Sequence, residues 1–294
     1  VVLQRSLCDG VERNEGVDQM CVGLGTGSSD RFWLVGNELF DSTHEFQTQN
    51  VSEHRDLIIE NNDMYRSLAV RQDCNTGNWP TNQSDTGDCQ CGEGILIFKE
   101  AGNDSGDKAI VFKNRIWGQR AQGRRPNGTG RDCGGTGSTA APAVSLSQST
   151  SYVEFGPPDE IGNIIADFAQ GVRLIMNDCG GSEVCGNNTI CGTLFHGQVR
   201  GDTGESANGI HFSAGHLDDN LICFNSFLNG EDVAGVNYME QDGDNEVGCN
   251  YIYDGREVNG SYNAGSGVQD DNIYGGDSDA PAGSGNVNVG TLSN

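Results

Sequence analysis

Two histidines that lie close together in the sequence offer an arrangement that could hold a transition metal or act as acid and base. His211 and His216 are followed by Asp218 and Asp219. Imidazole and carboxylate groups are common metal ligands and proton carriers. The interval between the two histidines, however, is not a known ligand spacing, so we favour a structural or surface role for them.

Acidic residues that alternate with small residues suggest a site for a hard cation. Asp242, Asp244 and Glu246 alternate with Gly243 and Asn245. Oxygen-rich loops of this kind suit Ca²⁺, so the three acids are candidate Ca²⁺ ligands, with solvated surface acids as the simpler alternative. An EF-hand is excluded, because valine and tyrosine occupy its glycine and final glutamate positions. No other cofactor is indicated.

Motifs for enzymatic catalysis are weak. The sequence has no G-x-S-x-G nucleophile elbow. The glycines from Gly23 to Gly27 only loosely resemble a dinucleotide-binding loop, and no βαβ pattern surrounds them. A glycosidase pair of carboxylates stays open, since 42 acidic residues give no basis for choosing two. The sequence therefore leaves enzymatic activity open and favours a role without catalysis.

Cysteine content points to an oxidised, exported protein. The chain begins at Val1 rather than at a methionine, which suggests a removed signal peptide. The short cysteine spacings are not those of zinc sites, so we expect disulfides. Because the number of cysteines is odd, pairing within the chain leaves one thiol free or available for a disulfide with another chain. The cysteines are Cys8, Cys21, Cys74, Cys89, Cys91, Cys133, Cys179, Cys185, Cys191, Cys223 and Cys249.

Glycosylation sequons agree with export. Chance alone would give roughly three or four in a chain of this composition, so the small excess is only suggestive. The candidate acceptors are Asn50, Asn82, Asn103, Asn127, Asn187 and Asn259.

The charge of the chain is strongly negative, at −25. Such a surface repels nucleic acid, and no apolar stretch approaches the roughly 20 residues of a membrane helix. We therefore expect neither a nucleic-acid partner nor membrane insertion. Residues 108–131 contain bases but no acid, which suggests a docking patch for an acidic partner or another copy of the chain. A solvated loop is the simpler interpretation. The bases proposed for this assembly patch are Lys108, Lys113, Arg115, Arg120, Arg124, Arg125 and Arg131.

The hydrophobic pattern predicts an α+β protein that is mostly β, with antiparallel sheets stapled by disulfides and one or two helices packed on them. The clearest helix is expected over 161–175, where isoleucines recur at helical spacing, and a second over 52–72. Residues 94–116 predict a hairpin, and residues 30–42 predict two strands around a Gly-Asn turn. Further short strands are expected near Leu194, over 210–212, 221–224, 233–239 and 251–253.

A single disulfide-rich domain is expected over 1–258, followed by an extended tail over 259–294 rich in Gly, Asn, Asp and Ser. Its residues 286–289 could add an edge strand to a neighbouring subunit. Three Cys-Gly steps beginning at Cys179 form a local repeat, but they are too few to indicate a β-helix.

These features together favour a secreted or cell-surface structural subunit that self-assembles into an extracellular sheath, surface layer or filament. The expected partners are other copies of the chain, with glycans in addition. One alternative is an extracellular Ca²⁺-dependent carbohydrate-binding module or glycoside hydrolase, with a binding cleft drawing on Trp33, Trp79 or Trp117. A viral surface glycoprotein is a further alternative, because it would share the cysteines and the sequons.

Overall fold

The computed structural model is built from strands that return to the same three sheets in a fixed order. It describes residues 1–9, 20–25, 29–40, 42, 44–48, 54–65, 93–98, 107–117, 123–124, 130–131, 142–147, 150–157, 162–166, 170–175, 186–196, 208–213, 219–228, 234–238, 245–253, 268–270, 273–275 and 287–290. Within these ranges there is no helix, and so none that could cross a membrane.

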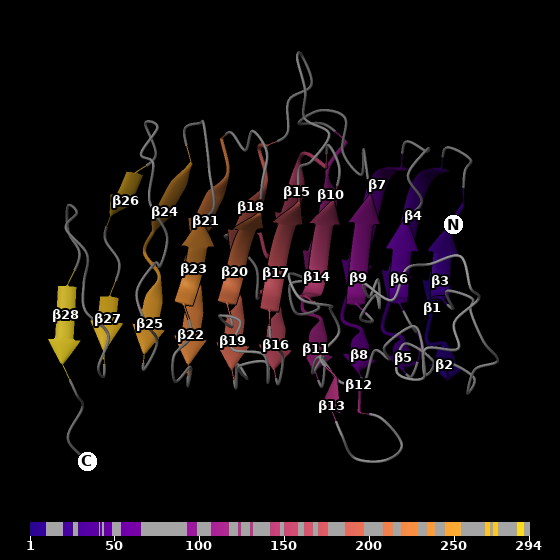
Figure 1. The fold of residues 1–294 in the computed structure, drawn as a ribbon. Helices are drawn as coiled ribbons and strands as arrows, with labels where there is room; N and C mark the ends of the chain where they lie inside the picture. The colour runs from indigo at the N-terminus through magenta and orange to yellow at the C-terminus, as the bar shows by residue number, and fades with distance from the viewer. Residues whose placement is uncertain are drawn as a thin grey trace, which may run out of the picture.

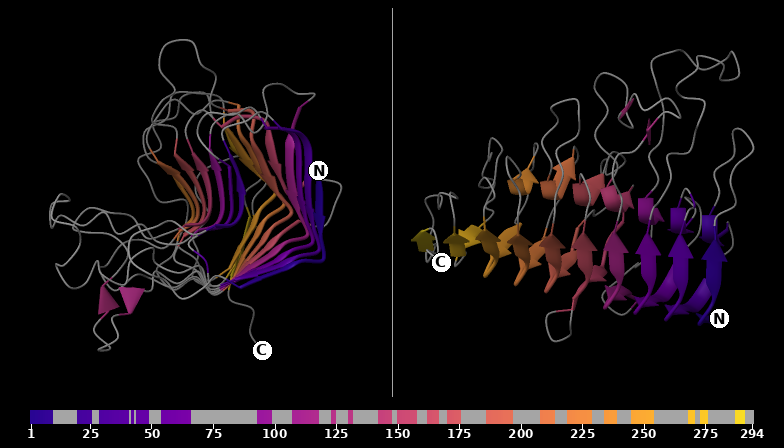
Figure 2. Two further views of the ribbon diagram at one scale, coloured as in Figure 1. Left: turned by 90° about the vertical axis from the view of Figure 1, so that its right-hand side faces the viewer. Right: turned by 90° about the horizontal axis from the view of Figure 1, so that it is seen from below.

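Three parallel sheets form the walls of the molecule (Figures 1 and 2). Sheet A contains β1 Val2–Gln4, β4 Ser29–Val35, β7 His54–Glu60, β10 Ala109–Phe112, β15 Val153–Phe155, β18 Thr189–Cys191, β21 Leu221–Cys223, β24 Glu246–Gly248 and β26 Val268–Asp270. Sheet B contains β2 Leu7–Asp9, β5 Glu38–Phe40, β8 Asp63–Tyr65, β11 Arg115–Trp117, β16 Ile164–Ala166, β19 Leu194–His196, β22 Ser226–Leu228, β25 Tyr251–Tyr253, β27 Ile273–Gly275 and β28 Val287–Gly290.

Sheet C contains β3 Met20–Leu24, β6 His44–Thr48, β9 Glu93–Phe98, β14 Pro142–Ser147, β17 Gln170–Ile175, β20 Asn208–Ser213 and β23 Ala234–Tyr238. A separate antiparallel pair is formed by β12 Gly123–Arg124 and β13 Gly130–Arg131. From β1 to β23 the chain passes from A to B to C and back to A, so each of these circuits places one strand in each sheet, while the described strands from β24 onward lie in sheets A and B alone. This is the arrangement of a parallel β-helix.

The core lies between the three sheets and is built from ladders of apolar side chains. In sheet A, Leu34, Ile59, Val111 and Phe155 occupy matching positions on successive strands, and all four are fully buried. Equivalent ladders run through sheets B and C. Parallel pairing stacks like residues on like residues, so each circuit buries its apolar side chains mainly against its two neighbours.

Among the corners between sheets A and B that the structure describes, each takes two residues except the one between β15 and β16. The first residue adopts a left-handed conformation, as in Asn61 (φ 54) and Lys113 (φ 57). The second is usually a buried asparagine, and these asparagines stack along the molecule. The Asn62 backbone N–H donates to Asn114 Oδ1 at 3.0 Å, and the Asn114 backbone N–H donates to Asn163 Oδ1 at 3.1 Å.

This asparagine ladder satisfies the backbone groups that the sharp corner takes out of the sheets. Its members at the A–B corner are Asn37, Asn62, Asn114, Asn163, Asn225 and Asn250, with Thr193 interrupting the series. A second and shorter ladder, made of Asn188, Asn220 and Asn245, leads into sheet A. Buried backbone polar groups need such partners, because leaving one unpaired costs about 1–3 kcal/mol.

The predicted α+β class with antiparallel sheets is therefore wrong. The helix expected over 161–175 is replaced by β16 and β17, which lie in sheets B and C. Ile165 and Val172 face the core from these two strands, whereas Ile164 is exposed on the other face of β16. The helix expected over 52–72 is likewise replaced by β7 and β8.

The hairpin predicted over 94–116 is also wrong, because β9 pairs with β6 and β14 in sheet C while β10 pairs with β7 and β15 in sheet A. The two strands predicted over 30–42 are present, but they meet at a corner between two sheets and do not pair with each other. Strands expected near Leu194 and over 210–212, 221–224 and 251–253 are confirmed.

The residues after 259 include three further strands, β26, β27 and β28. They continue sheets A and B, and β28 pairs in parallel with β27 of the same chain. Figure 1 shows β28 at the end of the molecule opposite the N-terminus.

Candidate functional site

The outer face of sheet C is the candidate site, and alternation along its strands defines which side chains lie there. Val144, Val172 and Ile210 share one face and belong to the core. Their neighbours Ser145, Arg173 and His211 therefore point to the opposite, outer face. The register places these three side by side on adjacent strands.

This outer row continues on both sides. Gln47 and Leu96 precede Ser145 on the strands toward the N-terminus, and the backbone of Asn237 follows His211. Adjacent parallel strands lie about 4.8 Å apart, so the Cα atoms of Ser145 and His211 are roughly 10 Å apart. We call Gln47, Leu96, Ser145, Arg173 and His211 the outer row of sheet C.

Although it faces outward, the outer row is well covered. Ser145 is 1% exposed, His211 3% and Leu96 6%, and Arg173 is half-buried. The chain reaches and leaves sheet C through long connections, such as those from Tyr65 to Glu93 and from Ile175 to Gly186. Long connections around a rigid sheet are typical locations for binding sites.

Buried oxygen atoms without hydrogen-bond partners gather at this sheet. Within the described ranges they include Gln47 Oε1, Ser145 Oγ and Gln170 Oε1 on sheet C strands, and Ser42 Oγ, two residues before β6. Buried polar groups in native proteins nearly always have a partner. A cluster of such atoms on one sheet therefore indicates a place where a polar ligand or water can bind.

His211 is a titratable group at the end of the outer row. Burial, and secondarily the positive charge of Arg173, lower the pKa of His211 to about 4. The imidazole is therefore neutral at pH 7 and offers one nitrogen as a proton acceptor. A guanidinium on the next strand can bind a carboxylate through two parallel hydrogen bonds.

The remaining predicted site residues do not join this row. Of the histidine–aspartate constellation, His211 lies on β20 and Asp219 is exposed before β21, whereas His216 and Asp218 lie outside the described residues. Of the proposed Ca²⁺ ligands, Glu246 is exposed on β24, and Asp242 and Asp244 lie outside the described residues. The described ranges contain no cluster of three or more metal-ligating side chains.

Two disulfides lie among the described residues. Cys8 bonds Cys21 between β2 and β3 of the first circuit, and Cys191 bonds Cys223 at in-register positions of β18 and β21 in neighbouring circuits. Cys249 is exposed and has a free thiol. The other cysteines named above fall outside the described residues. Disulfides of this kind are typical of an oxidising compartment, in agreement with an extracellular or periplasmic location.

Among the sequon asparagines, Asn187 lies half-buried with a left-handed backbone (φ 57) just before β18. Asn50, Asn82, Asn103, Asn127 and Asn259 lie outside the described residues. Glycosylation of all six stays a prediction.

Of the bases in the proposed assembly patch, Arg115 lies on β11 of sheet B, and Lys108 and Lys113 flank β10 of sheet A. Lys108 pairs with Glu154, and Arg115 pairs with Asp63. Lys113 lies over the ring of Phe112, with Nζ 4.8 Å from the ring centroid. Arg124 and Arg131 fall on the antiparallel pair β12 and β13, while Arg120 and Arg125 are outside the described residues.

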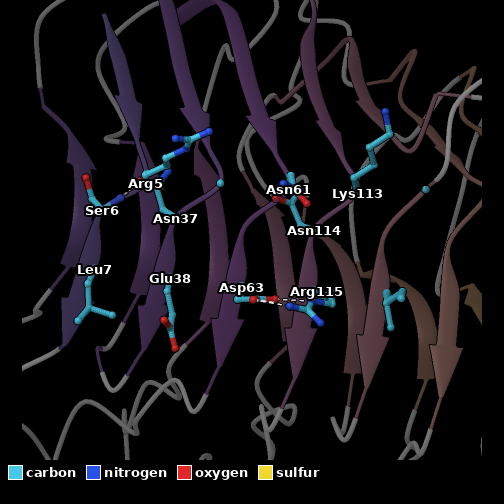
Figure 3. Close-up of a pocket in the computed structure, with 13 residues that line it drawn as sticks. Arg5, Ser6, Leu7, Asn37, Glu38, Asn61, Asp63, Lys113, Asn114 and Arg115 are labelled. Atoms are coloured by element: carbon cyan, nitrogen blue, oxygen red, sulfur yellow. Dashed lines mark hydrogen bonds and ion pairs between the residues drawn. The ribbon is translucent and has the colours of Figure 1, made fainter.

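Lys113 and Arg115 also line a pocket of about 580 Å³ at the A–B corner, together with Arg5, Glu38 and Asp63 (Figure 3). Asp63 and Arg115 form an ion pair through both carboxylate oxygens, and this contact raises the pKa of the Arg115 guanidinium. In Figure 3 the side chains of Glu38, Asp63 and Arg115 lie in a row across neighbouring strands.

Comparison with known proteins gives only a distant likeness. No family model and no curated protein matches the sequence. Two crystal structures of the periplasmic alginate epimerase AlgG, a single and a double mutant, align with TM-scores of 0.44 and 0.41 at 11% identity. The alignments cover 89% of this chain and 50% and 51% of those chains, so this chain spans about half of their length. At this TM-score and identity, the likeness does not indicate what this chain binds.

Proposed function

We propose that this protein acts on an extracellular polysaccharide that carries carboxylate groups, and that the outer row of sheet C holds one acidic sugar. The observation that carries the proposal is the placement of a guanidinium, a neutral imidazole and a hydroxyl without a hydrogen-bond partner on three adjacent strands.

Each residue has a distinct part in the proposed site. Arg173 pairs with the carboxylate of the sugar, Ser145 Oγ exchanges a hydrogen bond with a neighbouring hydroxyl, and His211 accepts a proton. When the carboxylate binds, its negative charge offsets the charge of Arg173 and raises the pKa of His211 toward its ordinary value. Binding of the acidic ligand therefore makes the imidazole a better base.

The reaction that fits these groups is removal of the proton from the carbon next to the carboxylate. The C–H bond breaks, its proton moves to an imidazole nitrogen of His211, and its electron pair enters the carboxylate as an enediolate. Arg173 stabilises the charge that develops on the carboxylate oxygens, which is the usual role of a fixed cation in such a site. Return of the proton to carbon completes an exchange cycle without any further reactant.

This proposal departs from the expectation of a chain without catalytic activity, and it differs from the glycoside hydrolase alternative. A glycosidase needs two carboxyl groups about 5–10 Å apart. None of the residues defined above as the outer row is acidic. Glu38 and Asp63 are adjacent on sheet B, but Glu38 accepts a hydrogen bond from Tyr65 and Asp63 is held by Arg115.

The test is hydrogen–deuterium exchange at carbon, followed by NMR. Oligogalacturonate and oligomannuronate are incubated with the protein in D₂O, and the proton next to each carboxylate is monitored. The wild-type protein is expected to exchange it, whereas Arg173→Gln and His211→Gln are expected to lose exchange by about 100-fold or more. Arg31→Gln is the matched control, because Arg31 is an exposed arginine on sheet A that pairs with Asp56. Lack of exchange with either oligomer, or equal exchange by Arg173→Gln, would contradict the proposal.

A structural subunit is the second candidate function, and the exposed thiol of Cys249 supports it. Oxidation of Cys249 between two chains would join them covalently. One such bond links only two copies, so growth of a filament would also need contacts elsewhere on the chain. Electrophoresis under reducing and non-reducing conditions tests this: a dimer band that disappears in Cys249→Ser supports the subunit, and a monomer band in both conditions removes this basis for it.

A further inference from the structure

Aromatic side chains form a continuous stack on the outer face of sheet B. Phe40, Tyr65 and Trp117 occupy matching positions on β5, β8 and β11. The rings of Phe40 and Tyr65 lie 4.9 Å apart at 3°, and those of Tyr65 and Trp117 lie 4.6 Å apart at 19°. These separations equal the spacing between strands, so the ring planes face along the row.

The stack ends abruptly at Ala166. The next positions of the row are Ala166 on β16 and His196 on β19. Two strand spacings, about 10 Å, separate Trp117 from His196, and the residue between them has only a methyl group. Trp117 is 43% exposed. Within this row no further ring covers the far face of its indole, and a ring that continued the stack would lie over Ala166.

Groups around this space differ in polarity on its two sides. Ile164, which shares a face of β16 with Ala166, is 40% exposed and gives an apolar wall next to the indole. Arg115 lies on the same face of β11 as Trp117, and its side chain is 63% exposed. The Asp63–Arg115 pair leaves further guanidinium N–H groups for hydrogen bonds.

The pocket at the A–B corner borders the same row. Glu38, Asp63, Arg115 and Ile164 line it. Arg115 and Ile164 lie two residues before Trp117 and Ala166 on β11 and β16, so the pocket lies next to the row. The Tyr65 hydroxyl donates to Glu38 Oε1 at 2.6 Å, which holds the ring under Trp117 in its stacked orientation.

We infer that the space over Ala166 is a second glycan-binding site, which takes one neutral pyranose ring stacked on Trp117. A pyranose combines an apolar ring face with a rim of hydroxyl groups. Its face fits the indole and Ile164, and its rim reaches Arg115, which is adjacent to Ile164 in the register. Sites for small ligands usually combine an aromatic or apolar surface with a small number of polar groups. This site lies on sheet B and is independent of the outer row of sheet C.

The experiment uses calorimetric titration of the full chain with cellohexaose, xylohexaose and chitohexaose. The wild-type protein is expected to bind at least one of them. Trp117→Ala should weaken binding by about ten-fold or more. Ala166→Phe should also weaken binding by about ten-fold or more, because a fourth ring fills the space over Ala166. The melting temperature of this variant should not fall. It therefore keeps the test valid if Trp117→Ala folds poorly.

Two control variants complete the design. Trp33→Ala removes an equally exposed tryptophan, 43%, from the outer face of sheet A, and Arg173→Gln alters the outer row of sheet C. Both are expected to bind within about two-fold of the wild-type protein. The inference is overturned if no neutral oligosaccharide binds, if Ala166→Phe binds as well as the wild type, or if Arg173→Gln abolishes binding.

Discussion

Removing one amide from the asparagine ladder provides the sharpest test of how the fold is held together. Asn114 is fully buried. Its Oδ1 accepts from the backbone N–H and from Nδ2 of Asn62, at 3.0 and 2.9 Å. Its Nδ2 donates to the carbonyls of Ile59 and Phe112, at 2.8 and 3.0 Å, and to Asn163 Oδ1 at 3.0 Å.

The change Asn114→Ala leaves at least two of these partners without a substitute. The Asn62 backbone N–H loses its acceptor at the corner, and the Ile59 carbonyl loses the donor that the side chain supplied. Each buried polar group left unpaired costs about 1–3 kcal/mol, and a small cavity adds to this. We therefore expect the free energy of unfolding to fall by about 3–5 kcal/mol.

Urea unfolding followed by tryptophan fluorescence measures the loss, and amide hydrogen exchange locates it at Asn62. Asn61→Gly is the matched control, because Asn61 precedes the ladder residue Asn62, is exposed, and has the left-handed backbone that glycine accepts (φ 54). It is expected to change stability by less than about 1 kcal/mol. A loss below about 1 kcal/mol for Asn114→Ala, or equal losses for both variants, would refute the role of the ladder.

Three further outcomes are expected. Thr193 occupies the buried position that interrupts the asparagine ladder. Thr193→Asn should raise the free energy of unfolding by about 1 kcal/mol in the same urea assay. A decrease would mean that the corner cannot hold an amide at this position. The pKa of His211 in the folded state, about 4, lies below its ordinary value of 6.5. The neutral imidazole therefore contributes fully to the free energy of unfolding above pH 6.5, and this contribution is lost between pH 6.5 and 4. From pH 7 to 5 the stability of the wild type should fall by about 2 kcal/mol more than that of His211→Gln, and parallel pH curves for the two proteins would contradict this. Replacing both cysteines of a disulfide with alanine should lower the free energy of unfolding by about 4 kcal/mol for Cys191–Cys223 and by about 3 kcal/mol for Cys8–Cys21. The longer closed loop, 32 residues against 13, restricts the unfolded chain more. The opposite order of the two losses in chemical denaturation would show that chain entropy does not dominate.

Sequence patterns located many of the strands but not their arrangement. The strand at Leu194 and those over 210–212 and 221–224 are visible as short apolar runs bounded by turn residues. Their parallel pairing is not visible, because each strand pairs with residues from other circuits rather than with its neighbour in sequence. Strands of three residues, such as β16 and β19, are too short for alternation to distinguish them from a helix.

A usable signal of the fold was present in the sequence. An asparagine followed two positions later by a buried apolar residue recurs at Asn37–Leu39, Asn62–Met64, Asn114–Ile116 and Asn163–Ile165. The intervals between successive asparagines range from 25 to 52 residues, because connections of different length separate the circuits. This variation hides the repeat from a search for a fixed period.

The candidate site was only partly predictable for the same reason. His211 was recognised as a residue that could transfer a proton, but it was grouped with His216 and Asp218, which are near it in sequence. The residues placed beside it by the fold are Arg173 and Ser145, from two other strands of sheet C. Register between distant strands decides this grouping, and no local pattern reveals it.

Stacking one circuit on the next gives this molecule the properties of a one-dimensional chain of coupled units. Each strand inside a sheet is bonded to the strands immediately before and after it in the stack, so each inner circuit is supported by two neighbours. Opening of one circuit should therefore destabilise the circuits next to it, and unfolding should spread along the stack from circuit to circuit. Limited proteolysis should accordingly shorten the protein stepwise and leave folded cores of decreasing length.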